Sequence, residues 1–163
     1  MGVLGVDDLE DIRNCQLELD DLQELIDKQA QCVMTFTTPS GWPMGVVLTY
    51  LYDDGVFYVT AVKQRKHVQA AARDPRVSIV IMNNGTDIPG RQMCTVKGHA
   101  TVHEDREMLD WFFPRFAQKH QPANPDGFTR LLDSENRVVI KIVPDSVPVS
   151  HDSRKISGNG RGN

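Results

Sequence analysis

The chain has 163 residues, of which 40% are apolar and 25% are charged, and its formal net charge is −4. This composition is typical of an ordinary globular domain and excludes fibrous, repetitive and wholly disordered classes. The length predicts a single domain over residues 1–150, with an N-terminal appendage at 1–18 and a polar, flexible tail at 151–163.

Net charge and cysteine content limit the possible binding partners and the cellular compartment of the protein. The acidic balance disfavours a nucleic-acid partner, because duplex binding depends on basic contacts to phosphate. No apolar run approaches the roughly 18 residues that span a bilayer, and the acidic N-terminus does not resemble a secretory signal. Cys15, Cys32 and Cys94 are odd in number and lack Cys-x-x-Cys spacing; Cys32 and Cys94 lie in apolar segments. We therefore expect buried thiols and a cytoplasmic protein without a membrane span.

Up to residue 61, the sequence predicts one helix and three strands. Residues 19–30 carry apolar side chains at helical spacing behind an acidic start, which is typical of an amphipathic helix. Residues 32–37 form a β-rich run. Two further β-rich runs, 44–52 and 56–61, are joined by Asp53-Asp54-Gly55, a strong hairpin signal because Asp and Gly tolerate positive φ angles.

From residue 64 onward, the sequence predicts two helices and three strands. Three consecutive alanines favour a short helix, whereas alternating and continuous apolar runs favour strands. The expected helices are 64–73 and 105–119, the latter bent at Pro114, and the expected strands are 77–82, 92–102 and 136–143.

Together these elements predict a mainly β fold. About six strands linked mostly in antiparallel order, with few helices between them, favour a six-stranded closed or nearly closed β-barrel flanked by helices. Closure also removes the exposed strand edges that promote aggregation.

A basic cluster marks the start of the helix at 64–73. Lys63, Arg65 and Lys66 follow a strand directly, and the N–H groups and dipole of a helix start favour an anion. The dipole contributes only about 0.3 to 1 kcal/mol, so Arg65 and Lys66 must supply charge-assisted hydrogen bonds to hold a dianion. The alternative is that these cations form a solvated helix face.

The order of these motifs resembles a known superfamily. A turn, a strand, an acidic-Gly hairpin and a strand ending in Thr60 precede Arg65-Lys66 and then Asp74-Pro75-Arg76-Val77, and a later strand, 96–102, carries a Gly-x-Ala-x-Val pattern. Over residues 21–143 the chain is similar to the split-barrel flavin-binding superfamily that includes pyridoxamine 5′-phosphate oxidase. It most resembles the actinobacterial branch of reductases that use the deazaflavin coenzyme F420.

The resemblance implies a homodimer whose cofactor groove lies at the interface between two barrels. It also implies cofactor-binding positions in which Arg65 and Lys66 grip the phosphate, Thr60, Ala61 and Val62 line the ring system, and Val46, Val47 and Leu48 pass beneath it. The implied function is an oxidoreductase that uses F420 for hydride transfer to an unsaturated small molecule. The alternatives are an FMN-dependent oxidoreductase of the same fold and a non-catalytic protein that binds or sequesters flavin or F420.

Departures from the superfamily pattern disfavour other activities. The strand at 45–52 lacks the Arg and Lys of true pyridoxamine phosphate oxidases, and the chain lacks their Arg-rich C-terminal segment, so vitamin oxidation is disfavoured. Haem-degrading relatives need an axial ligand, and His151 near the end of the chain is more typical of an exposed surface residue.

Two other groups of residues are assigned no site. His99 and His103 share a predicted strand face, but they lack a third ligand at suitable spacing, so no metal site is assigned. The aromatic run 111–113 could cap a substrate or pack the dimer, and packing is the simpler interpretation. No nucleophile or paired-carboxylate motif is present, which fits an enzyme whose cofactor carries the chemistry, and the catalytic residues remain unassigned.

Overall fold

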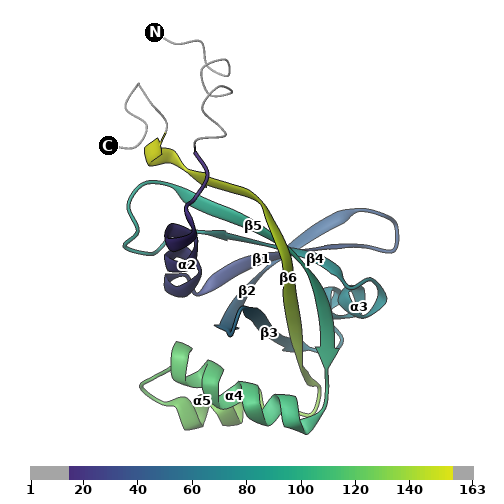
Figure 1. Cartoon of the computed structure of the whole chain (residues 1–163). Helices are drawn as coiled ribbons and strands as arrows, with labels where there is room; N and C mark the ends of the chain where they lie inside the picture. Colours follow the sequence, from purple (N-terminus) through teal and green to yellow (C-terminus); the bar gives the residue numbers. More distant parts are fainter. Residues whose placement is uncertain (1–14, 156–163) are drawn as a thin grey trace.

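Six β-strands pair side by side and close into a barrel in the order β1-β2-β3-β6-β5-β4, with every pairing antiparallel. The computed structural model describes residues 15–155 (Figure 1). The strands are β1 (Gln31–Thr37), β2 (Pro43–Asp53), β3 (Val56–Val62), β4 (Arg76–Met82), β5 (Gln92–His103) and β6 (Arg137–Asp152). The predicted fold class, a six-stranded antiparallel β-barrel with flanking helices, is confirmed.

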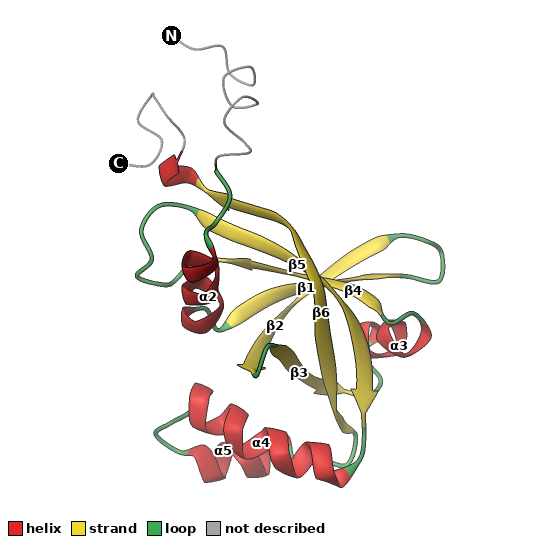
Figure 2. Cartoon of the chain, viewed as in Figure 1, coloured by secondary structure: helices red, strands yellow, loops and turns green. Residues whose placement is uncertain are grey.

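Within residues 15–155, four α-helices and one short 3-10 helix flank this barrel (Figure 2). They are α2 (Leu19–Lys28), α3 (Lys66–Arg73), α4 (Arg106–His120), α5 (Pro125–Leu132) and η1 (Ser153–Lys155). In Figure 1, α4 and α5 lie side by side across one end of the barrel. No helix in this part of the chain is both long and apolar enough to cross a membrane.

The barrel interior forms the main hydrophobic core. Strand alternation sends every second side chain inward, so Met34, Ile79 and Ile140 are fully buried. The Tyr50 hydroxyl donates a hydrogen bond of 2.6 Å to the Ile26 carbonyl oxygen, which ties α2 to the barrel. Cys32 and Cys94 are buried without a disulfide, as predicted, and burial raises the pKa of both thiols to about 12.

A second hydrophobic cluster packs α4 and α5 against the outside of the barrel. Phe112 and Phe113 are buried there, against Leu51 and Val139 of the strands. Phe112 and Phe113 therefore pack against the chain's own barrel, whereas a role of the aromatic run in packing a dimer stays a prediction. Helix α5 is absent from the elements expected from sequence; its start is capped by the Asn124 side chain, which accepts a hydrogen bond of 3.1 Å from the Gly127 N–H.

Strand β6 is longer than the 136–143 expected from sequence. It continues to Asp152, where the buried carboxylate accepts hydrogen bonds from the backbone and side chain of Arg154. Residues 151–155, expected to belong to a flexible tail, are therefore part of the strand and of η1. Residues 1–14 and 156–163 of the expected appendage and tail lie outside the described residues.

Candidate functional site

Strands β2 and β3 pair along only part of their length. Their register joins residues 50–53 of β2 to residues 56–59 of β3. Beyond this point β2 pairs with β1 through residues 43–49, whereas β3 pairs with β6 through residues 60–62. The two strands therefore diverge, and the barrel wall opens between them.

A groove of about 850 Å³ occupies this opening. Its volume falls in the usual range of small-molecule and cofactor sites, about 300 to 1,000 Å³. The lining includes all eight cofactor positions that the family resemblance implies: Val46, Val47, Leu48, Thr60, Ala61, Val62, Arg65 and Lys66. The rest of the lining comprises Phe36, Met44, Gln64, His67 and Arg137. The fold thus brings the predicted residues together from β2, β3 and the start of α3.

One end of the groove is positively charged. Arg65 and Lys66 stand where β3 leads into α3, and Arg137 joins them from β6. Within residues 15–155 none of the three makes an ion pair, whereas Lys63 next to them pairs with Glu104 at 2.5 Å. None of the described residues lining the groove is Asp or Glu. This end therefore suits an anionic group.

The start of α3 adds backbone donors to the same end. Arg65 occupies the position before the first helical residue, and no side chain caps the helix there. The N–H groups of the first helical turn therefore lack a side-chain acceptor, and they add to the attraction for an anion.

The opposite wall of the groove is apolar. Met44, Val46, Val47 and Leu48 from β2 line it, and Val47 is 64% exposed. Large apolar side chains that gather in an open groove indicate a surface that binds a ligand or partner. The site therefore suits a ligand with an apolar part and an anionic part.

Two buried nitrogen atoms on groove residues lack hydrogen-bond partners among the described residues. They are Nε2 of His67, a residue only 6% exposed, and Nε of Arg137. Burial, and then the nearby charge of Arg65, lowers the pKa of His67, so its imidazole is neutral at pH 7. Buried polar atoms are normally paired, so each nitrogen is suited to a water or ligand atom.

Neither of these two residues is among the positions predicted from the sequence. His67 follows Lys66 directly, and its place in the first turn of the helix was a usable signal. Arg137 reaches the groove only through the pairing of β6 with β3, which nothing in the local sequence indicates.

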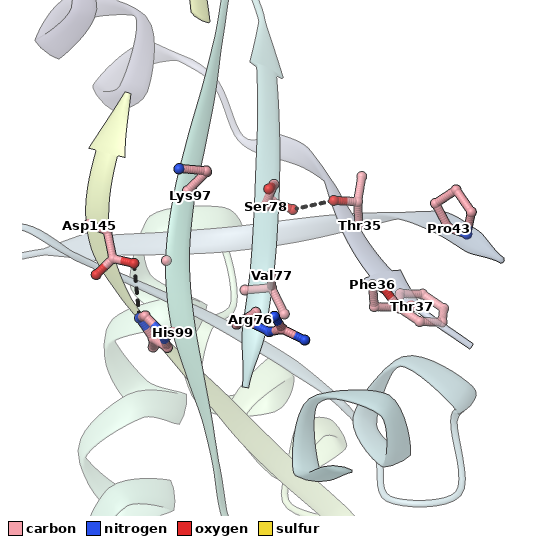
Figure 3. Close-up of a pocket in the computed structure, with 11 residues that line it drawn as sticks. Thr35, Phe36, Thr37, Pro43, Arg76, Val77, Ser78, Lys97, His99 and Asp145 are labelled. Carbon is pink, nitrogen blue, oxygen red and sulfur yellow. Dashed lines mark hydrogen bonds and ion pairs between the residues drawn. The ribbon is translucent and has the colours of Figure 1, made fainter. Parts of the chain in front are cut away.

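A second, smaller cavity of about 290 Å³ lies on the β1, β4, β5 and β6 side of the barrel (Figure 3). Most of its polar groups already have partners. His99 pairs with Asp145 at 3.0 Å, and the Thr35 hydroxyl donates a hydrogen bond of 3.2 Å to the Ser78 carbonyl oxygen. This cavity is therefore a weaker candidate for a cofactor than the groove.

The histidines considered as metal or haem ligands lie outside the groove. His99 and His103 face separate carboxylates, since His103 pairs with Asp105 at 3.1 Å. Among the described residues no group of three or more His, Cys, Asp or Glu side chains could hold a metal ion. His151 is not the exposed residue expected: it is half-buried near the end of β6, far along that strand from Arg137, and its Nε2 is buried.

Comparisons with solved structures show the same fold. A conserved hypothetical protein from Mycobacterium tuberculosis is 17% identical, with a TM-score of 0.74, covering 89% of this chain and 91% of that chain. An F420 reductase is 15% identical, with a TM-score of 0.58 and coverage of 77% and 94%. A haem storage protein from Vibrio cholerae is 14% identical, with a TM-score of 0.65 and coverage of 81% and 94%. A search of curated proteins finds no match.

The family assignment rests on the sequence as well as the fold. The family model described as pyridoxamine 5′-phosphate oxidase matches residues 19–149, which include the whole barrel except the end of β6 after residue 149. This match confirms the superfamily resemblance drawn from the sequence motifs. The chain therefore belongs to the pyridoxamine 5′-phosphate oxidase family of split barrels.

Proposed function

We propose that the protein is an oxidoreductase that binds coenzyme F420 in the groove between β2 and β3 and reduces an unsaturated small molecule. The observation that carries the proposal is the polarity of the groove, with an apolar β2 wall at one end and, at the other, Arg65 and Lys66, which make no ion pair with any residue between 15 and 155. F420 has a flat deazaflavin ring and a phosphorylated tail, which match these two ends. When bound, the deazaflavin supplies the hydride.

The residues of the chain hold and orient the cofactor. Arg65 and Lys66 bind the phosphate, and Val46 and Leu48 form the apolar floor under the ring. The Thr60 hydroxyl already donates a hydrogen bond of 2.8 Å to the Val138 carbonyl oxygen, so it can only accept from the ring. Residues 43–49 of β2 have no described strand partner on the side away from β1, and their backbone groups there are suited to the polar edge of the ring.

We further propose that two copies of the chain form a dimer with the groove at their interface. An apolar row crosses the outside of the barrel, because Val47 lies opposite Val33, Val33 opposite Val80, Val80 opposite Thr95, and Thr95 opposite Val149. Opposed residues on neighbouring strands share one face of the sheet. Val47 belongs to both the row and the groove, and it is 64% exposed while Val149 is 51% exposed. A partner covering this row also covers one edge of the groove.

A protein that binds the cofactor without turnover is the second candidate. Among the described residues lining the groove, none is a carboxylate, a cysteine or a tyrosine, and His67 is the one side chain of a type that ordinarily titrates near neutrality. The site therefore has few groups to protonate a substrate, and this favours either chemistry carried by the cofactor alone or simple sequestration. FMN remains the alternative cofactor for both candidates.

One experiment separates these possibilities. The purified protein is titrated with F420 and with FMN, and binding is read from quenching of cofactor fluorescence. Reduced cofactor is then mixed with enone and quinone acceptors, and its oxidation is followed by absorbance. We expect tight F420 binding and acceptor-dependent oxidation. Binding without oxidation supports sequestration, and failure to bind either cofactor contradicts the whole proposal.

We also propose a cytoplasmic location. The buried thiols of Cys32 and Cys94 form no disulfide, which suits a reducing compartment. Fractionation of the producing cell, with the protein detected by antibody, tests this location directly, and recovery in an exported fraction contradicts it.

A further inference from the structure

Arg137 lies at the cationic end of the groove. It is the first residue of β6, whereas Arg65 and Lys66 stand at the start of α3. It pairs with Val62 of β3, and two backbone hydrogen bonds fix this point of the chain. The Lys63 N–H donates to the Asn136 carbonyl oxygen at 2.8 Å, and the Arg137 N–H donates to the Ser134 carbonyl oxygen at 3.0 Å. The guanidinium of Arg137 therefore extends from backbone that is held against the entry to α3.

Arg137 also lines a smaller polar depression of about 300 Å³ beside the groove. The cations of that depression have acidic partners: Lys63 pairs with Glu104 at 2.5 Å, and Arg106 pairs with Asp133 at 2.6 Å. Arg137 makes no ion pair within residues 15–155, although Glu104 and Asp133 line the same depression. Its charge is therefore left for a group that enters from the groove.

The buried Nε of Arg137 also indicates that this side chain binds an anion. Nε of Arg137 is buried and has no acceptor among the described residues, whereas buried donors in proteins are nearly always bonded. A guanidinium presents its N–H groups in a rigid planar fork that matches the oxygen atoms of phosphate or carboxylate. An anion seated beside Arg137 would give the buried Nε–H the acceptor that the described residues do not provide.

We propose that Arg137 binds the anionic group of the ligand and completes, from β6, a clamp whose other half is Arg65 and Lys66. The inference rests on the proposed function, because it takes the groove to be the ligand site. Cations on two sides suit a tetrahedral phosphoryl group, whose oxygen atoms point in several directions, better than a planar carboxylate. The phosphodiester of F420 and the phosphomonoester of FMN share this chemistry.

The test compares ligands with and without the phosphoryl group. F420 and FMN are titrated against the wild-type protein and Arg137→Met, beside riboflavin and the deazaflavin core that lacks the phosphorylated tail. We expect Arg137→Met to weaken binding of the phosphorylated ligands about 10- to 100-fold and to leave the phosphate-free ligands unchanged. Arg137→Lys should restore part of the affinity. Arg130→Met, which removes an exposed cation of α5 that lines neither the groove nor the depression, should leave every affinity unchanged.

Two results overturn the inference. Equal affinity of Arg137→Met and the wild-type protein for the phosphorylated ligands shows that Arg137 does not touch the anion. An equal loss for phosphate-free ligands shows that Arg137 only shapes the groove. Thermal melting checks that Arg137→Met is folded, and Arg137→Gln replaces it if it is not.

A second measurement works without any cofactor. Inorganic phosphate is titrated into the ¹⁵N-labelled wild-type protein, and the Arg137 Nε–H resonance is followed by NMR, assigned by its loss in Arg137→Lys. We expect a saturable shift, and a resonance that does not move overturns the inference. If phosphate shifts the resonance but neither F420 nor FMN binds, the proposed function fails while the role of Arg137 stands. If both cofactors bind but neither the resonance nor the Arg137→Met affinity changes, the role of Arg137 fails while the groove remains the cofactor site.

Discussion

Val62 of β3 lies directly opposite Arg137 of β6, and this register places an arginine from the last strand beside the start of α3. The groove is therefore assembled from segments distant in the chain: β2 supplies the apolar wall, and β3, α3 and β6 meet at the cationic end. Its two ends can be tested separately.

Removing both helix-start cations should weaken cofactor binding by at least about 100-fold. Each charge-assisted hydrogen bond contributes about 1.5 to 3 kcal/mol, and the variant Arg65→Ala/Lys66→Ala loses two such donors. Fluorescence titration with F420 and FMN measures the change. The charge-matched control Arg91→Ala/Arg130→Ala removes two exposed cations outside the groove and should bind as the wild type does. Comparable affinity in the two double variants would place the phosphate elsewhere.

The apolar row on the barrel surface should be required for dimer formation. Val80 and Val149 belong to the row but not to the groove, so Val80→Glu/Val149→Glu places charges in the proposed interface without touching the cofactor lining. We expect light scattering to report a dimer for the wild type and a monomer for the variant, with weaker cofactor binding. The control Leu131→Glu changes a 70% exposed residue on α5 and should remain dimeric. A monomeric wild-type protein would refute the interface.

Stability should decrease as the pH falls from about 6.5 toward 5. Burial lowers the pKa of His67 and of His120, whose Nε2 lies 2.8 Å from the Tyr50 carbonyl oxygen. The unfolded chain therefore binds protons at a higher pH than the folded chain, and the stability present above the unfolded pKa is lost below it. Each histidine contributes a loss of at most about 1.4 kcal/mol per pH unit, until its folded pKa is reached.

Urea denaturation at pH 7.5 and 5.5 measures this dependence. His120→Gln keeps a side-chain N–H donor for the Tyr50 carbonyl oxygen but removes one titrating group, so its stability should change less between the two pH values. The interpretation is wrong if His120→Gln shows the same pH dependence as the wild type.

Gly98 should not tolerate alanine. A Cβ at this position would lie 2.5 Å from the Val143 carbonyl oxygen, where β5 and β6 shift register. Both strands would have to move apart, and such overpacking costs about 1 to 3 kcal/mol of folding free energy. The midpoint of urea unfolding measures the loss. Lys97→Ala, one residue away on an exposed position of the same strand, is the control and should change stability little.

Much of the barrel could be predicted from sequence because its strands are runs rich in apolar and β-branched residues. Along β1, β4 and β5 buried residues also alternate with less buried ones, so that Met34 and Ile79 point inward at period two. The later half of β6 escaped prediction because Pro144 and Pro148 interrupt it and its side chains are mostly exposed, so neither composition nor alternation marks a strand there.

The candidate site was predictable only in part, for a related reason. Arg65 and Lys66 stand together in sequence at a helix start, a local signal that motif reasoning can use. Arg137 depends on a pairing between β3 and β6, which leaves no local pattern in the residues that make it. Helix α5 did carry a local signal that the prediction missed, because Asn124 caps its start and Pro125 stands in its first turn.

The divergence of β2 from β3 also has a thermodynamic consequence. On either side of the opening, β2 is held by β1 and β3 by β6, so within residues 15–155 the two strands pair with each other directly only through residues 50–53 and 56–59. A ligand bound between the walls contacts both strands in the region where no hydrogen bonds join β2 to β3. Occupancy and resistance to unfolding are then linked, and ligand at 100 times its dissociation constant stabilises the barrel by about 2.7 kcal/mol.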